Sequence, residues 1–366
     1  MENVTNVTDG LCDYLFQNYW SRWPFGYDSF PKEVQLFANY SAPRYKKTKC
    51  GFDLREMHFP DKALETFLEN DKGRQHLKWY DEQNIRHYAR LNMHIGNYTD
   101  DEEIGHFINF FRVLREEQKK IQTTGFHMLG FMVHNYHWSD EVKHIMRDHV
   151  QRYIKEMDLD AVMFQTTQTL LLLRTNPYKQ DVVCHLRGPA MWTHFAEIRY
   201  QATFVRTLEF MKTLQLPHNL RVLLSLSSAT YHTYYTPPIR KADISIFTNL
   251  ECNISLTSPD ASIWNKKKCS GRFIDKNIEN TSITYYYVSF RLFDTQISMC
   301  DTNETFKMKI CNAQSQYSYN GGYVLFDIDH SDVENLCSDP NFTDGFADAH
   351  YIKKFMHTSF RNCSSL

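Results

Sequence analysis

The sequence predicts an α/β protein built as a (β/α)₈ TIM barrel in a single, disulfide-linked domain. Its 366 residues are 42% hydrophobic and 15% aromatic, enough apolar material for one large barrel. Eight segments have the apolar, β-branched and aromatic content of strands, and several are separated by runs of helical periodicity. They are residues 11–20, 86–96, 126–137, 161–167, 221–231, 244–256, 283–293 and 321–328. An open doubly wound sheet would need a G-x-G-x-x-G loop after its first strand, and none follows 11–20.

Helices are expected between these strands. Apolar residues at helical spacing, from Ile104 to Leu114, predict a helix over about 101–122. Ser139 is the expected N-cap of the next one. The other predicted helices cover about 140–157, 189–214, 302–316 and 346–357. We expect the barrel to occupy residues 10–358, between an N-terminal tail, 1–9, and a C-terminal tail, 359–366.

Charge and hydropathy exclude two classes of partner. Lys and Arg total 41 against 43 Asp and Glu, a net charge of -2, so the chain lacks the basic character of a nucleic-acid-binding protein. No apolar stretch is long enough to form a transmembrane helix. We therefore expect no nucleic acid partner and no membrane span.

N-glycosylation motifs indicate the secretory pathway. The pattern Asn-x-Ser/Thr occurs nine times, whereas this composition would give about three by chance. The acceptors are Asn3, Asn6, Asn39, Asn97, Asn253, Asn280, Asn303, Asn341 and Asn362. The first ten residues have no apolar signal-peptide core. We therefore expect a secreted, extracellular glycoprotein whose signal peptide is not part of this chain.

The nine cysteines point to structural disulfides, because no CxxC pair suggests a zinc or redox site. The odd number leaves one thiol over. Pairing cannot be read from sequence, but position suggests three bonds. These are Cys252–Cys269, Cys311–Cys337 and, with less support, Cys12–Cys50.

One segment resembles a known family. Residues 321–337, GGYVLFDIDHSDVENLC, are similar to the eighth-strand pattern G-G-x-M-x-W-x-L-D-x-D-D-x-x-G-x-C of the chitinases and chitinase-like proteins of glycoside hydrolase family eighteen. The matching residues are Gly321, Gly322, Asp329, Asp332 and Cys337. The order of the other elements resembles secreted chitinase-like proteins of arachnids. The resemblance implies a (β/α)₈ barrel, a chitin-type ligand and no cofactor.

The resemblance also identifies lost groups. The family's fourth strand ends in D-x-x-D-x-D-x-E, where the final Glu is the proton donor. The corresponding residues here are Asp160, Met163, Gln165 and Thr167, so only the first Asp remains. A threonine hydroxyl cannot act as a general acid near neutral pH. The family's Trp beneath the sugar aligns with Phe326.

Three functions follow as hypotheses. The first is a non-hydrolytic barrel that binds an N-acetylglucosamine-type glycan or a protein. Phe326 would be its floor, Gln165 the partner of the acetamide and Tyr231 its wall, while Asp160 orients the strand end.

The second hypothesis is an active glycosidase with relocated carboxylates, Asp327 or Asp329. The third is a structural or signalling glycoprotein with no glycan cleft. We expect no metal site, because His144 and His149 are five residues apart on a predicted helix and point away from each other.

Overall fold

The structure is a computed structural model, and its secondary structure divides the chain into a parallel and an antiparallel part. It describes residues 7–18, 32–54, 62–94, 101–132, 140–166, 184–185, 204–228, 231–235, 251–252, 254–257, 275–279, 284–290, 295–326, 328, 346–358 and 363. The Cα atoms cluster in two compact units. One comprises residues 1–132, 138–164 and 213–223, and the other 133–137, 165–212 and 224–366. The domain bounds expected from the sequence stay a prediction.

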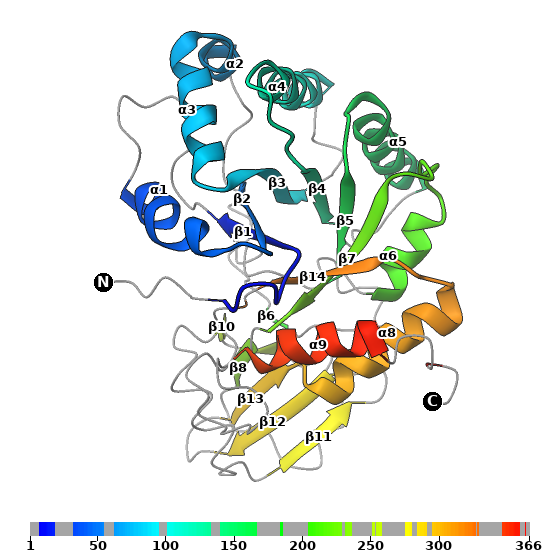
Figure 1. Cartoon of the computed structure of the whole chain (residues 1–366). Coiled ribbons are helices and arrows are strands. Elements are labelled where there is room, and N and C mark those ends of the chain that lie inside the picture. The colour runs from blue at the N-terminus through cyan, green and yellow to red at the C-terminus, as the bar shows by residue number, and fades with distance from the viewer. Residues whose placement is uncertain are drawn as a thin grey trace. The chain divides into compact units, whose positions relative to one another are not determined.

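A curled parallel sheet of seven strands is the main feature of the fold (Figure 1). Its order is β1-β2-β3-β4-β5-β7-β14. The strands are β1 (Tyr14–Asn18), β2 (Lys49–Asp53), β3 (Ile85–His94), β4 (His127–Met132), β5 (Ala161–Gln165), β7 (Arg221–Ser227) and β14 (Gly322–Phe326). The strand β2 was not predicted, because KCGFD is short and contains a glycine and an aspartate. It makes the strand that ends in Gln165 the fifth in chain order, whereas the resemblance implied the fourth.

Burial explains why the central strands were recognised. Every residue of β4 and of β5 is buried. A parallel strand covered on both faces reads as an almost continuous apolar run, and both sequences, HMLGFM and AVMFQ, have that character.

Helices cover the outer face of this sheet in Figure 1. They are α2 (Lys62–Glu69), α3 (Asp71–Glu82), α4 (Asp101–Lys120) and α5 (Asp140–Glu156). Aromatic rings join helix to strand. The Tyr80 ring lies 5.1 Å from that of Phe52, measured between centroids, and the Phe111 ring 5.6 Å from that of His127. The predicted helices 101–122 and 140–157 are therefore confirmed.

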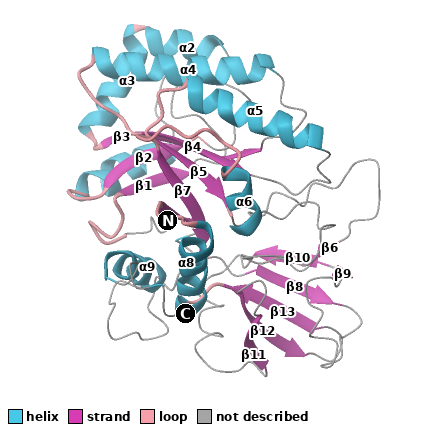
Figure 2. Ribbon diagram, turned by 90° about the vertical axis from the view of Figure 1, so that its right-hand side faces the viewer, coloured by secondary structure: helices cyan, strands magenta, loops and turns pink. Residues whose placement is uncertain are grey.

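A second, antiparallel sheet corrects part of the barrel prediction (Figure 2). Its order is β10-β8-β13-β12-β11. The strands are β8 (Tyr231–Tyr235), β10 (Ile254–Thr257), β11 (Asp275–Glu279), β12 (Thr284–Phe290) and β13 (Thr295–Cys300). The segments 244–256 and 283–293 were predicted as barrel strands, but β10 and β12 belong to this sheet. Apolar content identifies a strand but does not specify which strand it pairs with. Among the described residues, the parallel sheet therefore has seven strands and not the eight that were predicted.

Shorter elements complete the described chain. They are α1 (Lys32–Leu36), the π-helical η1 (Phe37–Ser41), the 3₁₀ turn η2 (Ala42–Arg44), α6 (Phe204–Met211), α8 (Asn303–Tyr317), α9 (Ala347–Thr358) and the paired β6 (Cys184–His185) and β9 (Glu251–Cys252). Helix α8 begins with a capping box between Thr302 and Thr305. A fully buried ion pair follows, in which Lys309 Nζ lies 2.5 Å from Asp301 Oδ1.

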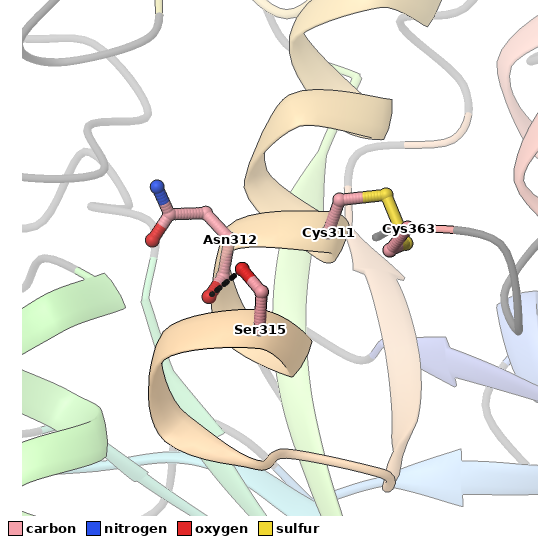
Figure 3. Close-up of a disulfide and its surroundings, with 4 residues drawn as sticks. All are labelled: Cys311, Asn312, Ser315 and Cys363. Carbon is pink, nitrogen blue, oxygen red and sulfur yellow. Dashed lines mark hydrogen bonds between the residues drawn. A yellow bond between two sulfur atoms is a disulfide. The ribbon is translucent and has the colours of Figure 1, made fainter. Parts of the chain in front are cut away.

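One disulfide corrects the predicted pairing. Cys311 of α8 is bonded to Cys363, with 5.0 Å between their Cα atoms, so it does not pair with Cys337 (Figure 3). The sequence favoured the nearer cysteine, but the end of the chain returns to α8. Cys12 and Cys50 keep their thiols, which contradicts the Cys12–Cys50 bond. Cys269 and Cys337 lie outside the described residues.

Gly51 is predicted to be intolerant of any side chain. A Cβ at this position in β2 would lie 2.3 Å from the carbonyl oxygen of His87. Gly51→Ala should lower the free energy of unfolding by about 1–3 kcal/mol, measured by urea denaturation. Gly105→Ala in α4 is the matched control, because a Cβ there meets nothing within 4 Å. It should raise stability by about 0.5–1 kcal/mol. Equal effects of the two changes would contradict the packing in β2.

Two buried histidines predict a loss of stability in acid. Burial, with Arg86 and Lys49 nearby, lowers the pKa of His87 to about 3, and burial also lowers the pKa of His127 well below its usual value. The His87 Nδ1 accepts a hydrogen bond from the Phe126 amide at 2.9 Å, which requires an unprotonated Nδ1. A folded-state pKa below the unfolded value of about 6.5 gives stability that is complete above that pH and is lost as the pH falls.

Between pH 6.5 and pH 4.5, His87 should cost about 2–3 kcal/mol of unfolding free energy, and His127 should add to the loss, measured by urea denaturation at each pH. His87→Asn keeps an acceptor and should flatten this dependence, whereas His218→Asn, at an exposed position, should leave it unchanged. If the unfolding free energy of His87→Asn depended on pH in the same way as that of the parent protein, protonation of His87 would not be the cause of the acid destabilisation.

Candidate functional site

The candidate site lies where β5, β7 and β14 end. Barrel proteins place their sites at the carboxyl ends of the parallel strands. The described residues at these three ends belong to the same compact unit. They are Gln165, Thr166, Ser225, Ser227, Ser228 and Phe326.

Two residues that the resemblance aligns with aspartates of the family pattern lie inside the protein. Met163 faces Gly130, because its Cε lies 2.5 Å from the position that a Cβ on Gly130 would take. Gln165 is two residues further along β5, so the two side chains share a face of the sheet. Both are fully buried. The family alignment therefore identified a pair of residues on one side of β5, although neither carries a charge.

A pair of hydroxyl groups fixes the end of β5 against β7. The Thr166 amide donates to Ser225 Oγ at 2.8 Å, and the Thr166 hydroxyl donates to the Ser225 carbonyl oxygen. Both residues are fully buried. Because both contacts join the same two residues, the ends of the two strands are held in a fixed register.

A hydrogen bond between backbone groups joins the end of β7 to β14. The amide of Ser228 donates to the carbonyl oxygen of Phe326 at 3.1 Å. Phe326 is 9% exposed and Ser228 is 8% exposed. The buried Ser228 Oγ has no hydrogen-bond partner in the described part of the protein. It is therefore a buried hydroxyl, just after the end of β7, whose donor is not used by the described residues.

Asp160 lies at the opposite end of β5. Its Oδ2 accepts hydrogen bonds from the His127 amide and from Arg115 Nη2, each at 2.8 Å. Its backbone N–H donates to the His127 carbonyl, and its own carbonyl accepts from the Arg221 amide. These contacts agree with its expected role of orienting the strand. A direct contact between Asp160 and a glycan stays a prediction.

Other predicted site residues are only partly placed. Tyr231 begins β8 in the antiparallel sheet, opposite Thr257 and Met299, and its role as a wall stays a prediction. Thr167, Asp327 and Asp329 lie outside the described residues.

The described residues of the candidate site carry uncharged polar groups and one aromatic ring. Its groups are one amide, four hydroxyls and one aromatic ring, none of which exchanges a proton near neutral pH. Amides and hydroxyls form hydrogen bonds with sugar hydroxyl and acetamide groups, and an aromatic face packs against the apolar face of a sugar ring. Among the residues that the structure describes, no three His, Cys, Asp or Glu form a group able to hold a metal ion.

The sequence predicted the strand β7 but not its serines as candidate site residues. In RVLLSLSS, Leu and Ser alternate over 224–227, and all four of these residues are buried. Alternation of this kind places Ser225 and Ser227 on one face of the strand. Serines among buried leucines at a strand end were the available signal, since buried polar groups are usually kept for a hydrogen bond.

Comparison with known proteins gives the fold. No family model matches the chain, and no curated protein matches it significantly. Among solved structures, the GH18 chitinase of Cycas revoluta, in complex with allosamidin, has a TM-score of 0.55 at 13% identity, over 87% of each chain. The fold is that of the GH18 chitinases.

Two larger proteins contain the same fold. The chitinase ChiW of Paenibacillus sp. FPU-7 has a TM-score of 0.52 at 11% identity and covers 89% of this chain, but only 34% of its own. Chi1 of the Yersinia entomophaga toxin complex has the same TM-score and identity, over 83% of this chain and 57% of its own. None of the helices in the described ranges has the length and apolar character needed to cross a membrane.

The side chain of Asp160 is predicted to stabilise the folded protein. Asp160→Ala removes the acceptor shared by Arg115 and the His127 amide, and should lower the free energy of unfolding by about 2–3 kcal/mol, measured by urea denaturation. Glu156→Ala is the control, because its partner Arg152 lies on the same helix surface. It should cost less than about 0.5 kcal/mol. An Asp160→Ala protein as stable as the parent would show that these contacts do not hold the strand.

Proposed function

We propose that the protein is a secreted chitinase-like barrel that binds a chitin-type glycan without cleaving it. The proposal is supported by the uncharged residues that the family resemblance aligns with carboxylates along and just after β5. Met163 and Gln165 occupy an inward face where the family pattern has aspartates, and Thr167 aligns with the family's acid. Without a general acid, a rate contribution of about 10²–10⁴ is lost.

The remaining groups suit recognition of an N-acetylated sugar. The Gln165 amide has a donor and an acceptor for an acetamide. The ring of Phe326 offers an apolar face, and the hydroxyl of Ser228, whose amide donates to the Phe326 carbonyl, has an unused donor. Binding through these groups needs no charge on the protein.

Burial favours a second candidate function. Gln165 has no exposed surface and Phe326 is only 9% exposed, so direct contact with a glycan would require both residues to become more exposed. A secreted structural or signalling glycoprotein with no glycan cleft would have its strand ends closed in this way.

Secretion is supported by two features of the described residues. Asn39 and Asn303 are both exposed, as attachment of a glycan requires. The Cys311–Cys363 disulfide is of the kind that persists in oxidising compartments.

Isothermal titration with tetra-N-acetylchitotetraose tests the proposal. We expect measurable affinity, reduced about tenfold in Phe326→Ala because the ring's stacking contact is lost. Ser228→Ala removes a single unpartnered hydroxyl and should weaken binding without lowering the melting temperature, so it separates binding from folding. Leu36→Ala, at an exposed position of α1, is the control and should leave binding unchanged.

Other outcomes would select the alternatives. A correctly folded protein that binds no chitin oligosaccharide would support the structural or signalling function. Hydrolysis of a chromogenic chitobiose substrate, abolished by Asp329→Asn, would identify an active glycosidase.

A further inference from the structure

Two cysteines occupy paired backbone positions in a two-stranded sheet. Strands β6 and β9 are antiparallel, and their register pairs Cys184 with Cys252 and His185 with Glu251. The two cysteines are far apart in the sequence but belong to the same compact unit. We propose that Cys184 and Cys252 form a disulfide that fastens β6 to β9.

The backbone register satisfies the geometric requirement. Directly opposed residues of an antiparallel pair have Cα atoms about 4.5–5.5 Å apart and side chains on the same face. Disulfides join residues whose Cα atoms are about 4.4–6.8 Å apart. The register therefore brings these cysteines within bonding distance with no movement of the backbone.

The other cysteines leave few competing partners. Cys311 is bonded to Cys363, while Cys12, Cys50 and Cys300 are thiols. Three cysteines then remain as partners for Cys184, namely Cys252, Cys269 and Cys337. Only Cys252 has a described position opposite Cys184. Because a sulfur forms one disulfide, this bond replaces the Cys252–Cys269 bond suggested by the sequence.

Formation of the bond is a two-electron oxidation. The two thiols lose two protons and two electrons and form one S–S bond. The electrons reduce the disulfide of an oxidant such as glutathione disulfide, which is released as two thiols by thiol–disulfide exchange. The two-residue ladder β6–β9 is too short to be stable alone, so a covalent link explains how it persists.

Peptide mapping tests the assignment directly. The full chain is folded in a glutathione redox buffer and its free thiols are alkylated without reduction. It is then deglycosylated, because the predicted glycan acceptor Asn253 is next to Cys252, and digested with trypsin. Cys184, Cys252 and Cys269 fall on separate tryptic peptides, which are 180–187, 242–266 and 269–272. We expect mass spectrometry to find 180–187 linked to 242–266 as the main species. Recovery of 242–266 linked to 269–272, or of both 180–187 and 242–266 alkylated, would overturn the proposal.

Single substitutions provide a second readout. Cys184→Ser should leave Cys252 as a new alkylated thiol on 242–266, and Cys252→Ser should do the same for Cys184 on 180–187. The melting temperature of the double variant should be lowered by no more than that of either single variant, because all three variants lack the same bond. Cys12→Ser is the control and should change no linked peptide. If Cys252 stays bonded in Cys184→Ser, the assignment is wrong.

Discussion

The junction around Asp160 holds the amino ends of several strands together. One carboxylate oxygen receives the Arg115 guanidinium and the His127 amide, and the backbone of Asp160 pairs with His127 on one side and Arg221 on the other. Arg115 also donates to the Gly125 carbonyl, so the end of α4 is tied to the same point. The amino ends of β4, β5 and β7 and the carboxyl-terminal part of α4 are therefore joined at one position.

The carboxyl ends of β5 and β7 carry side chains that are both polar and buried. A buried hydroxyl or amide costs free energy unless it is hydrogen-bonded, and Thr166 and Ser225 meet that requirement with each other. The Ser228 hydroxyl does not meet it among the described residues. An unsatisfied buried hydroxyl costs free energy that a hydrogen-bonded one does not. This contrast is the physical reason why the proposed binding function is placed at these strand ends.

The sequence predicted the elements whose pattern is local. Helices α4 and α5 follow from apolar spacing, and β4 and β5 from runs covered on both faces. Strand pairing is not local, so the antiparallel position of Tyr285 and its neighbours was read as a barrel strand. In the site, Met163 and Gln165 were singled out by the resemblance to the family's fourth-strand pattern, and their shared face of β5 was seen only in the structure. The contacts of Ser225 and Ser228 depend on which strand lies beside β7, which no single-chain pattern reveals.

The neutral histidines of the parallel sheet have a consequence for calorimetry. His87 and His127 take up protons only when the chain opens, so unfolding in mildly acidic solution withdraws protons from the buffer. The measured heat then includes the ionisation heat of that buffer. Scans in acetate and in a buffer with a large ionisation heat, matched in pH, would return different enthalpies for one and the same transition, and the slope between them counts the protons absorbed.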